Sequence, residues 1–188
     1  MHDIEPFYNW QHIYNSENDE RSPFFDVEHS EFEFKNAVYN YLIHPQWEQF
    51  SSNTLYLKII FAEYEKGYCI IELIGEWNDL INNDIMWFKR EVIDVLITEG
   101  IEQFIIIGEN VLNFHASDDS YYEEWFNEIE EGWIAFVNFR DHVLEEFQNM
   151  NIDYYINFGG ELNAIDWRMM NPFQLKKIIE SVIKKRLN

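Results

Sequence analysis

Two apolar segments separated by three polar residues constrain the fold more than any other feature of this sequence. The first covers residues 54–64 (TLYLKIIFAEY) and the second residues 68–75 (YCIIELIG), with only Glu-Lys-Gly between them. Alternation of side chains is typical of a β-strand, and so short a connection joins strands that run antiparallel. The sequence therefore predicts a hairpin with these residues on one face of its first strand: Leu55, Leu57, Ile59 and Phe61.

The hydrophobic period changes after Gly75. Apolar residues then recur at steps of three and four, at positions 81, 85, 88, 92 and 96. This spacing is typical of an amphipathic helix. Asn78 or Asp79 can cap its first turn, and Gly100 can end it in the left-handed conformation. A long helix is therefore expected between the hairpin and the next apolar segment.

Strand-like and helix-like segments alternate through the rest of the chain. The expected strands are residues 103–108, 133–139 and 153–158, and the expected helices are residues 120–131, a helix containing Val143, Leu144 and Phe147, and a final helix opening at Asn171-Pro172. Such alternation predicts parallel strands joined by right-handed crossovers. The predicted fold class is α/β, with a mixed, mainly parallel sheet, an N-terminal antiparallel hairpin and helices on both faces.

The first third of the chain has a weaker pattern. Residues 31–43 (EFEFKNAVYNYLI) are rich in aromatic and β-branched residues before His44-Pro45, which predicts a further strand. Residues 1–30 combine acidic and aromatic residues without a clear period. We interpret residues 1–30 as an arm whose aromatic side chains dock on a single α/β domain, residues 31–188.

Charge and composition exclude several classes of protein. The chain has 35 acidic and 13 basic residues and a formal net charge of −22, which opposes binding to nucleic acids. The acidic N-terminal residues lack the basic-then-apolar arrangement expected of a signal peptide, and no apolar run reaches the roughly 20 residues needed to span a bilayer. Cys69, the single cysteine, has no disulfide partner and lies in an apolar strand, as expected for a buried residue in a reducing compartment. We therefore predict a cytoplasmic protein that binds neither nucleic acid nor membrane.

Several polar and aromatic residues follow the predicted strands at the edge where open α/β sheets bind ligands. We expect them to form a binding rim: Glu76, Trp77, Asp79, Glu109, His115, Asp118 and Trp125. Histidine and carboxylate side chains are ligands for divalent metals, so His115, Asp118 and Asp119 are the candidate metal ligands. Helix initiation is the alternative explanation, because Ser120 and Glu123 have the spacing of a capping box and the two aspartates precede a helix.

The order of elements resembles that of the STAS family, the anti-sigma-factor antagonists. The resemblance runs over residues 54–186, through GYCIIELIGEWND and a helix to QFIIIGENVLNFHASDDS and a second helix. It implies a STAS-like fold and a bacterial regulatory protein. In that family, a serine in the loop after the third strand can be phosphorylated by a partner kinase, and the positions that match it here are Ser117 or Ser120.

Two functions remain open. The first is a non-catalytic interaction or regulatory module whose acidic surface binds a protein partner with basic groups. It is favoured by the charge imbalance and by the absence of nucleotide-binding glycine motifs and of a nucleophile elbow. The alternative is a metal-dependent hydrolase or small-ligand binder that uses the predicted rim. No resident cofactor is expected apart from that divalent metal.

Overall fold

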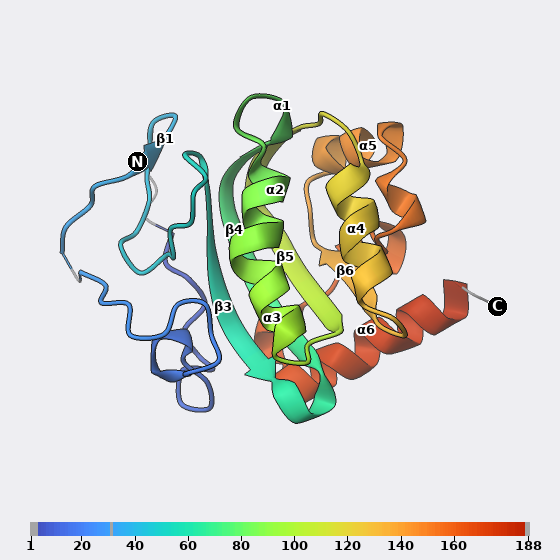
Figure 1. Cartoon of the computed structure of the whole chain (residues 1–188), viewed down its shortest axis with the longest axis horizontal. Helices are drawn as coiled ribbons and strands as arrows, with labels where there is room; N and C mark the ends of the chain where they lie inside the picture. Colours follow the sequence, from blue (N-terminus) through green and yellow to red (C-terminus); the bar gives the residue numbers. More distant parts are fainter. Residues whose placement is uncertain (1–3, 31, 187–188) are drawn as a thin grey trace.

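The computed structural model describes residues 4–30 and 32–186, and its core is a four-stranded sheet (Figure 1). The strands lie in the order β3 (Leu55–Glu63), β4 (Tyr68–Asn78), β5 (Gln103–His115) and β6 (Trp133–Val137). β3 pairs antiparallel with β4, whereas β4, β5 and β6 are parallel. The predicted hairpin and the mixed, mainly parallel sheet are confirmed.

The hairpin contains an irregularity that alternation alone does not predict. Ile59 pairs with Ile71, but Phe61 pairs with Ile70, so a bulge inserts one residue into β3. An extra residue moves every later side chain to the opposite face. Leu55, Leu57 and Ile59 therefore pack in one core, while Phe61 packs in the other, and its predicted place beside Leu55 is wrong.

In the described part of the chain, one face of the sheet is covered by α2 (Asp84–Phe88), α3 (Asp94–Thr98), α4 (Ser120–Glu128) and α5 (Asp141–Asn149), while the short α1 (Asp79–Asn82) lies at the end of β4. The single helix predicted after Gly75 is divided, because Asn83 adopts the left-handed conformation between α1 and α2. A π-helical segment, Lys89–Ile93, joins α2 to α3. The predicted ends are confirmed, since Asn78 caps α1 and Gly100 has a positive φ after α3.

The second face is covered by α6 (Pro172–Arg186) and by part of the N-terminal segment. Leu175 and Ile179 of α6 pack against Ile105 and Val137 of the sheet. Trp10 lies in the same cluster and makes an edge contact with Trp167. The sheet is thus buried on both faces, which explains the nearly continuous apolar sequences of β4 and β5.

The N-terminal segment, residues 4–30 and 32–54, runs beside β3 and contributes to both faces (Figure 1). Phe24 and Phe50 belong to the core under α2 and α3, whereas Trp10 belongs to the core under α6. Glu48 forms an antiparallel bridge with Leu57, so this segment also covers part of the β3 edge. Covering an edge strand in this way protects it from pairing with other chains.

Two strand predictions are wrong. Residues 32–43 form only β1 (Ala37–Val38) and β2 (Tyr41–Leu42), because Tyr39 has a positive φ and the chain turns there; Glu31 lies outside the described residues. Residues 153–158 are not a strand. Their segment starts as a 3₁₀ turn, Ile152–Tyr154, and meets the sheet only where Asn157 bridges Ala135. In the described part of the chain, no helix has the length and apolar character needed to cross a bilayer.

Candidate functional site

The predicted binding rim does not form as one site. Trp77 and Trp125 are completely buried in the core beneath the helices, where both contact Phe88. Large aromatic rings without exposed area contribute to stability and offer no surface to a ligand. The expectation that these two side chains belong to a surface rim is therefore wrong.

Glu109 is separated from the other acidic residues because β5 continues far beyond the strand predicted at residues 103–108. Its Oε1 accepts hydrogen bonds from Trp167 Nε1 (2.8 Å) and Asn138 Nδ2 (2.9 Å), and Arg168 forms an ion pair with its other oxygen. Glu76, by contrast, contacts Tyr39 and lies 3.4 Å from His115 Nε2. The two glutamates have separate sets of partners and do not converge.

The candidate metal ligands are engaged with local partners. Asp118 accepts hydrogen bonds from the backbone N–H (3.0 Å) and the hydroxyl of Ser120. These contacts lower the pKa of Asp118, the hydroxyl contact first. Asp119 accepts a hydrogen bond from Tyr155 (3.3 Å). Asp119, not Ser120, is the N-cap residue of α4, and it makes no side-chain cap, so the predicted capping box is wrong. His115, Asp118 and Asp119 are not among the clusters with converging ligand atoms in residues 4–30 and 32–186.

Asp79 is an internal anchor for the start of α1. Oδ1 accepts hydrogen bonds from Trp77 Nε1 (2.8 Å) and the backbone N–H of Ile85 (2.8 Å). Oδ2 accepts one from the hydroxyl of Tyr122 (2.7 Å). Burial raises the pKa of Asp79 to about 7, although all three donors act to lower it. Asp79 therefore positions α1 and is not available as a ligand.

The anchored turn presents two apolar side chains to solvent. Leu80 and Ile81 of α1 are 67% and 78% exposed, and the exposed side chains of Ser117 and Asp118 follow the adjacent strand β5. Asn78 Oδ1 accepts a hydrogen bond from the Ile81 N–H (2.9 Å), which fixes the turn from its other side. We call Leu80, Ile81, His115, Ser117 and Asp118 the β4/β5 end surface.

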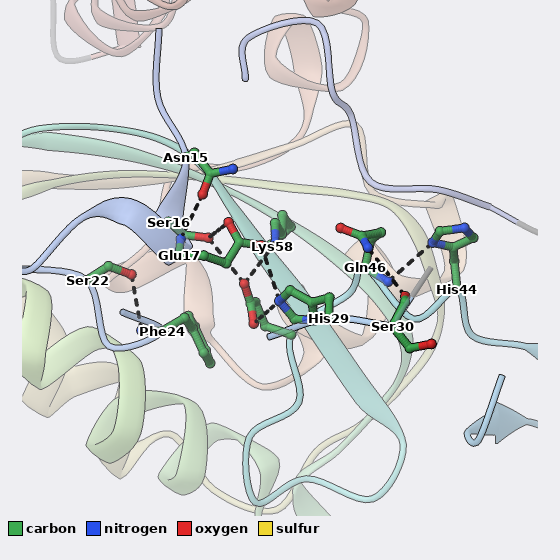
Figure 2. Close-up of polar contacts among 11 residues, drawn as sticks. Asn15, Ser16, Glu17, Ser22, Phe24, His29, Ser30, His44, Gln46 and Lys58 are labelled. Atoms are coloured by element: carbon green, nitrogen blue, oxygen red, sulfur yellow. Dashed lines mark hydrogen bonds and ion pairs between the residues drawn. The ribbon is translucent and has the colours of Figure 1, made fainter. Parts of the chain in front are cut away.

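A second polar cluster was not predicted, and it lies between the N-terminal segment and β3. Lys58 Nζ lies 2.9 Å from Glu48 Oε1 and forms an ion pair with Glu17 (Figure 2). His29 Nε2 lies 3.0 Å from Glu48 Oε2 and 3.2 Å from Glu17 Oε1. We call Glu17, His29, Glu48 and Lys58 the buried charge cluster. The feature of the sequence that could have indicated this cluster is Lys58, a positively charged residue within a largely apolar strand.

The members of the buried charge cluster compensate one another. Burial opposes ionisation of Glu17, but contacts with His29 and Lys58 lower its pKa to about 2. The carboxylates of Glu17 and then Glu48 raise the pKa of His29 to about 9. Two carboxylates, one ammonium and one imidazolium sum to zero formal charge. Neutrality makes burial of these four groups tolerable, and it ties residues 17, 29 and 48 to the sheet.

Glu72 is the Cα partner of Lys58 across the hairpin and receives a different part of the N-terminal segment. Its Oε2 accepts a hydrogen bond from the backbone N–H of Phe7 (2.9 Å), and Arg168 lies 3.4 Å from Oε1. Burial raises the pKa of Glu72 to about 7. Charged residues within both strands of the hairpin thus mark where the N-terminal segment docks.

Glu72 will make stability depend on pH. Its folded pKa is above the unfolded value, so its contribution is fully present below about pH 4.5 and is lost as the pH rises through about 7. From the two pKa values, the free energy of unfolding should fall by about 3 kcal/mol from this group between pH 4.5 and 8. Urea unfolding at both pH values should show that Glu72→Gln lacks this loss. Glu65→Gln, on the exposed β3–β4 turn, is the control; an unchanged pH slope in Glu72→Gln would contradict the assignment.

Comparison with known proteins finds similarity to solved structures of one protein, SpoIIAA. No family model and no curated protein matches the chain. The structure of the antagonist SpoIIAA in its unphosphorylated form matches with a TM-score of 0.42 and 16% identity, over 58% of this chain and 93% of that one. The Bacillus cell fate determinant SpoIIAA in its phosphorylated form matches with a TM-score of 0.38 and 14% identity, over 58% and 96%.

Proposed function

We propose that the protein is a non-catalytic interaction module that binds a protein partner through its β4/β5 end surface. The observation that carries this proposal is the exposure of Leu80 and Ile81, two adjacent large aliphatic side chains, on a turn held by hydrogen bonds to Asn78 and Asp79. Adjacent exposed aliphatic side chains on a fixed turn offer apolar area that a partner can bury. Because Asp79 and Asn78 already fix the turn, binding there costs little conformational entropy.

The charge around this pair favours a partner with basic groups. Asp118 and Glu123 are exposed at the start of α4, and Tyr122 of the same helix contacts Asp79 directly beneath α1. The chain as a whole has a net charge of −22. Burial of the apolar pair would give affinity for a partner. The acidic residues beside it would attract a positively charged surface at long range. The proposed complex should therefore weaken as salt is added.

The arrangement of reactive side chains supports a non-catalytic role. Burial raises the pKa of the Cys69 thiol well above its usual value, and this residue lies within β4, away from any surface. The carboxylates expected to form a hydrolytic rim are divided between separate networks centred on Asp79, Glu109 and Glu76. A metal-dependent hydrolase at the predicted rim receives no support from these contacts.

Substitution of the exposed pair should abolish partner binding without unfolding the protein. A photo-crosslinking residue at position 81 would first identify the partner, and titration calorimetry would then measure its dissociation constant. Leu80→Ser with Ile81→Ser should weaken binding by about 30- to 100-fold, the effect of losing an apolar contact of roughly 2 to 3 kcal/mol. Met169→Ser is the matched control, because Met169 is 82% exposed outside this surface. Equal weakening by both variants, or crosslinks only to a second copy of the chain, would contradict a basic protein partner.

A further inference from the structure

We propose that Glu17, His29 and Glu48 form a binding site for one divalent cation of the zinc type. Among residues 4–30 and 32–186, these side chains place one ligand atom each within 4.8 Å of the others. They come from three separate parts of the N-terminal segment and meet at the edge of β3 (Figure 2). The site is distinct from the proposed partner-binding surface.

The ligand atoms lie close enough together for a single tetrahedral ion to contact all three. His29 Nε2 is 3.0 Å from Glu48 Oε2 and 3.2 Å from Glu17 Oε1. Ligands that bind zinc at about 2.0 to 2.1 Å in tetrahedral geometry lie about 3.3 Å apart. His29 Nε2 and Glu48 Oε2 face each other as an ion pair, but neither atom makes a hydrogen bond of good geometry in the described part of the chain. Their side chains are only 10% and 1% exposed, so two buried polar atoms point into the proposed site.

The ligands are held in place before an ion arrives. The backbone of Glu48 exchanges hydrogen bonds with Leu57 of β3 (2.7 and 3.2 Å). The 3₁₀ turn that carries Glu17 is capped by the side chain of Asn15. Such support limits the entropy lost on binding. An entry path also exists, because a cavity of about 490 Å³ borders Glu17 and another of about 270 Å³ borders His29 and Glu48.

The donor set selects the class of ion. One imidazole nitrogen and two carboxylate oxygens suit Zn²⁺ and related transition-metal ions, whereas Ca²⁺ requires six to eight oxygens and Mg²⁺ an octahedral oxygen shell. Lys58 contacts the opposite oxygen of Glu48, Oε1, and leaves Oε2 toward His29. Lys58 also pairs with Glu17 Oε1, the oxygen that faces His29. Its ammonium repels a bound cation and should limit affinity. This gives the proposal an unusual signature: removing Lys58 should strengthen zinc binding.

Thermal unfolding and titration calorimetry of the full chain test the proposal. After chelator treatment, Zn²⁺ at a hundredfold its dissociation constant should raise the unfolding midpoint by about 5 to 10 °C, with one ion bound per chain. Mg²⁺ and Ca²⁺ at the same concentration should leave the midpoint unchanged. Absence of a zinc-dependent rise, or an equal rise with Mg²⁺, would overturn the proposal.

Four variants locate the ion. His29→Gln should abolish zinc binding, Glu17→Gln should weaken it at least tenfold, and Lys58→Met should strengthen it at least tenfold. His115→Ala should bind zinc with the same affinity as the unsubstituted protein, because His115 lies outside the site. If His29→Gln fails to fold, Glu17→Gln and Lys58→Met still test the proposal, because they should change the affinity for zinc in opposite directions. Loss of zinc binding in His115→Ala, or no effect of either Glu17→Gln or Lys58→Met, would refute the assignment.

Partner binding at the β4/β5 end surface is measured separately, so failure of one proposal is distinguishable from failure of the other.

Discussion

Replacing Lys58 by methionine, in the absence of zinc, will lower the free energy of unfolding by about 3 kcal/mol, the lower end of the range for breaking a buried ion pair. The lysine neutralises Glu17 and Glu48 at a position where Glu48 is almost completely buried. Methionine retains much of the apolar volume of the lysine side chain but leaves the two carboxylates with only His29 as a counter-ion. That remaining imidazolium is the reason for expecting the lower value. In a domain of this size, the thermal midpoint should fall by about 6 to 12 °C.

Two controls separate a charge effect from a general effect of losing a lysine. Lys35→Met removes an ion pair with Glu33 in which the lysine is 75% exposed, so its effect on stability should be close to zero. Combining Lys58→Met with Glu17→Gln and Glu48→Gln removes the whole set of compensating charges except His29, and should recover part of the lost stability. Equal losses in the single and the triple variant would show that packing of the lysine chain, and not charge compensation, holds this region together.

The elements with strong local patterns could be predicted from the sequence. The β3–β4 hairpin, the crossover to β5 and the final helix follow from periods of two and about 3.6 residues and from caps at Asn78 and Gly100. The limits of β5 could not. Gly108 and the polar residues after it resemble a loop, yet the strand continues to His115. A Cβ at Gly108 would lie 2.2 Å from the Phe139 ring, so this glycine is required for packing within a strand rather than for a turn.

The buried charge cluster depends on contacts that no local pattern encodes. Glu17, His29 and Glu48 are 41, 29 and 10 residues before Lys58 in the sequence, and the segment that carries them has little regular structure. A charged residue in each strand of an apolar hairpin was the available signal. Lys58 and Glu72 pair across β3 and β4, and each binds a different part of the N-terminal segment. Buried charges require partners, so their presence in the strands implies that some other segment must reach them.

Asp79→Ala is the second substitution with a large expected effect, about 3 kcal/mol in the free energy of unfolding at pH 7. It leaves three buried donors without an acceptor, namely Trp77 Nε1, the Ile85 N–H and the Tyr122 hydroxyl. Each unsatisfied donor costs about 1 to 3 kcal/mol, and removal of a poorly solvated carboxylate offsets part of the sum. Urea unfolding measures the change directly.

Asp118→Ala is the matched control, because Asp118 is exposed and accepts hydrogen bonds from Ser120, two residues away. The loss in free energy of unfolding should be below about 1 kcal/mol, as for other exposed groups at a helix start.

The structural role of Asp79 also has a functional consequence, since Asp79 holds the turn that presents Leu80 and Ile81. At temperatures where Asp79→Ala remains folded, its proposed partner should bind more weakly, because ordering of α1 must then be completed on binding. Full partner affinity in a folded but destabilised Asp79→Ala would show that the exposed pair needs no fixed turn, and would move the proposed contact away from α1.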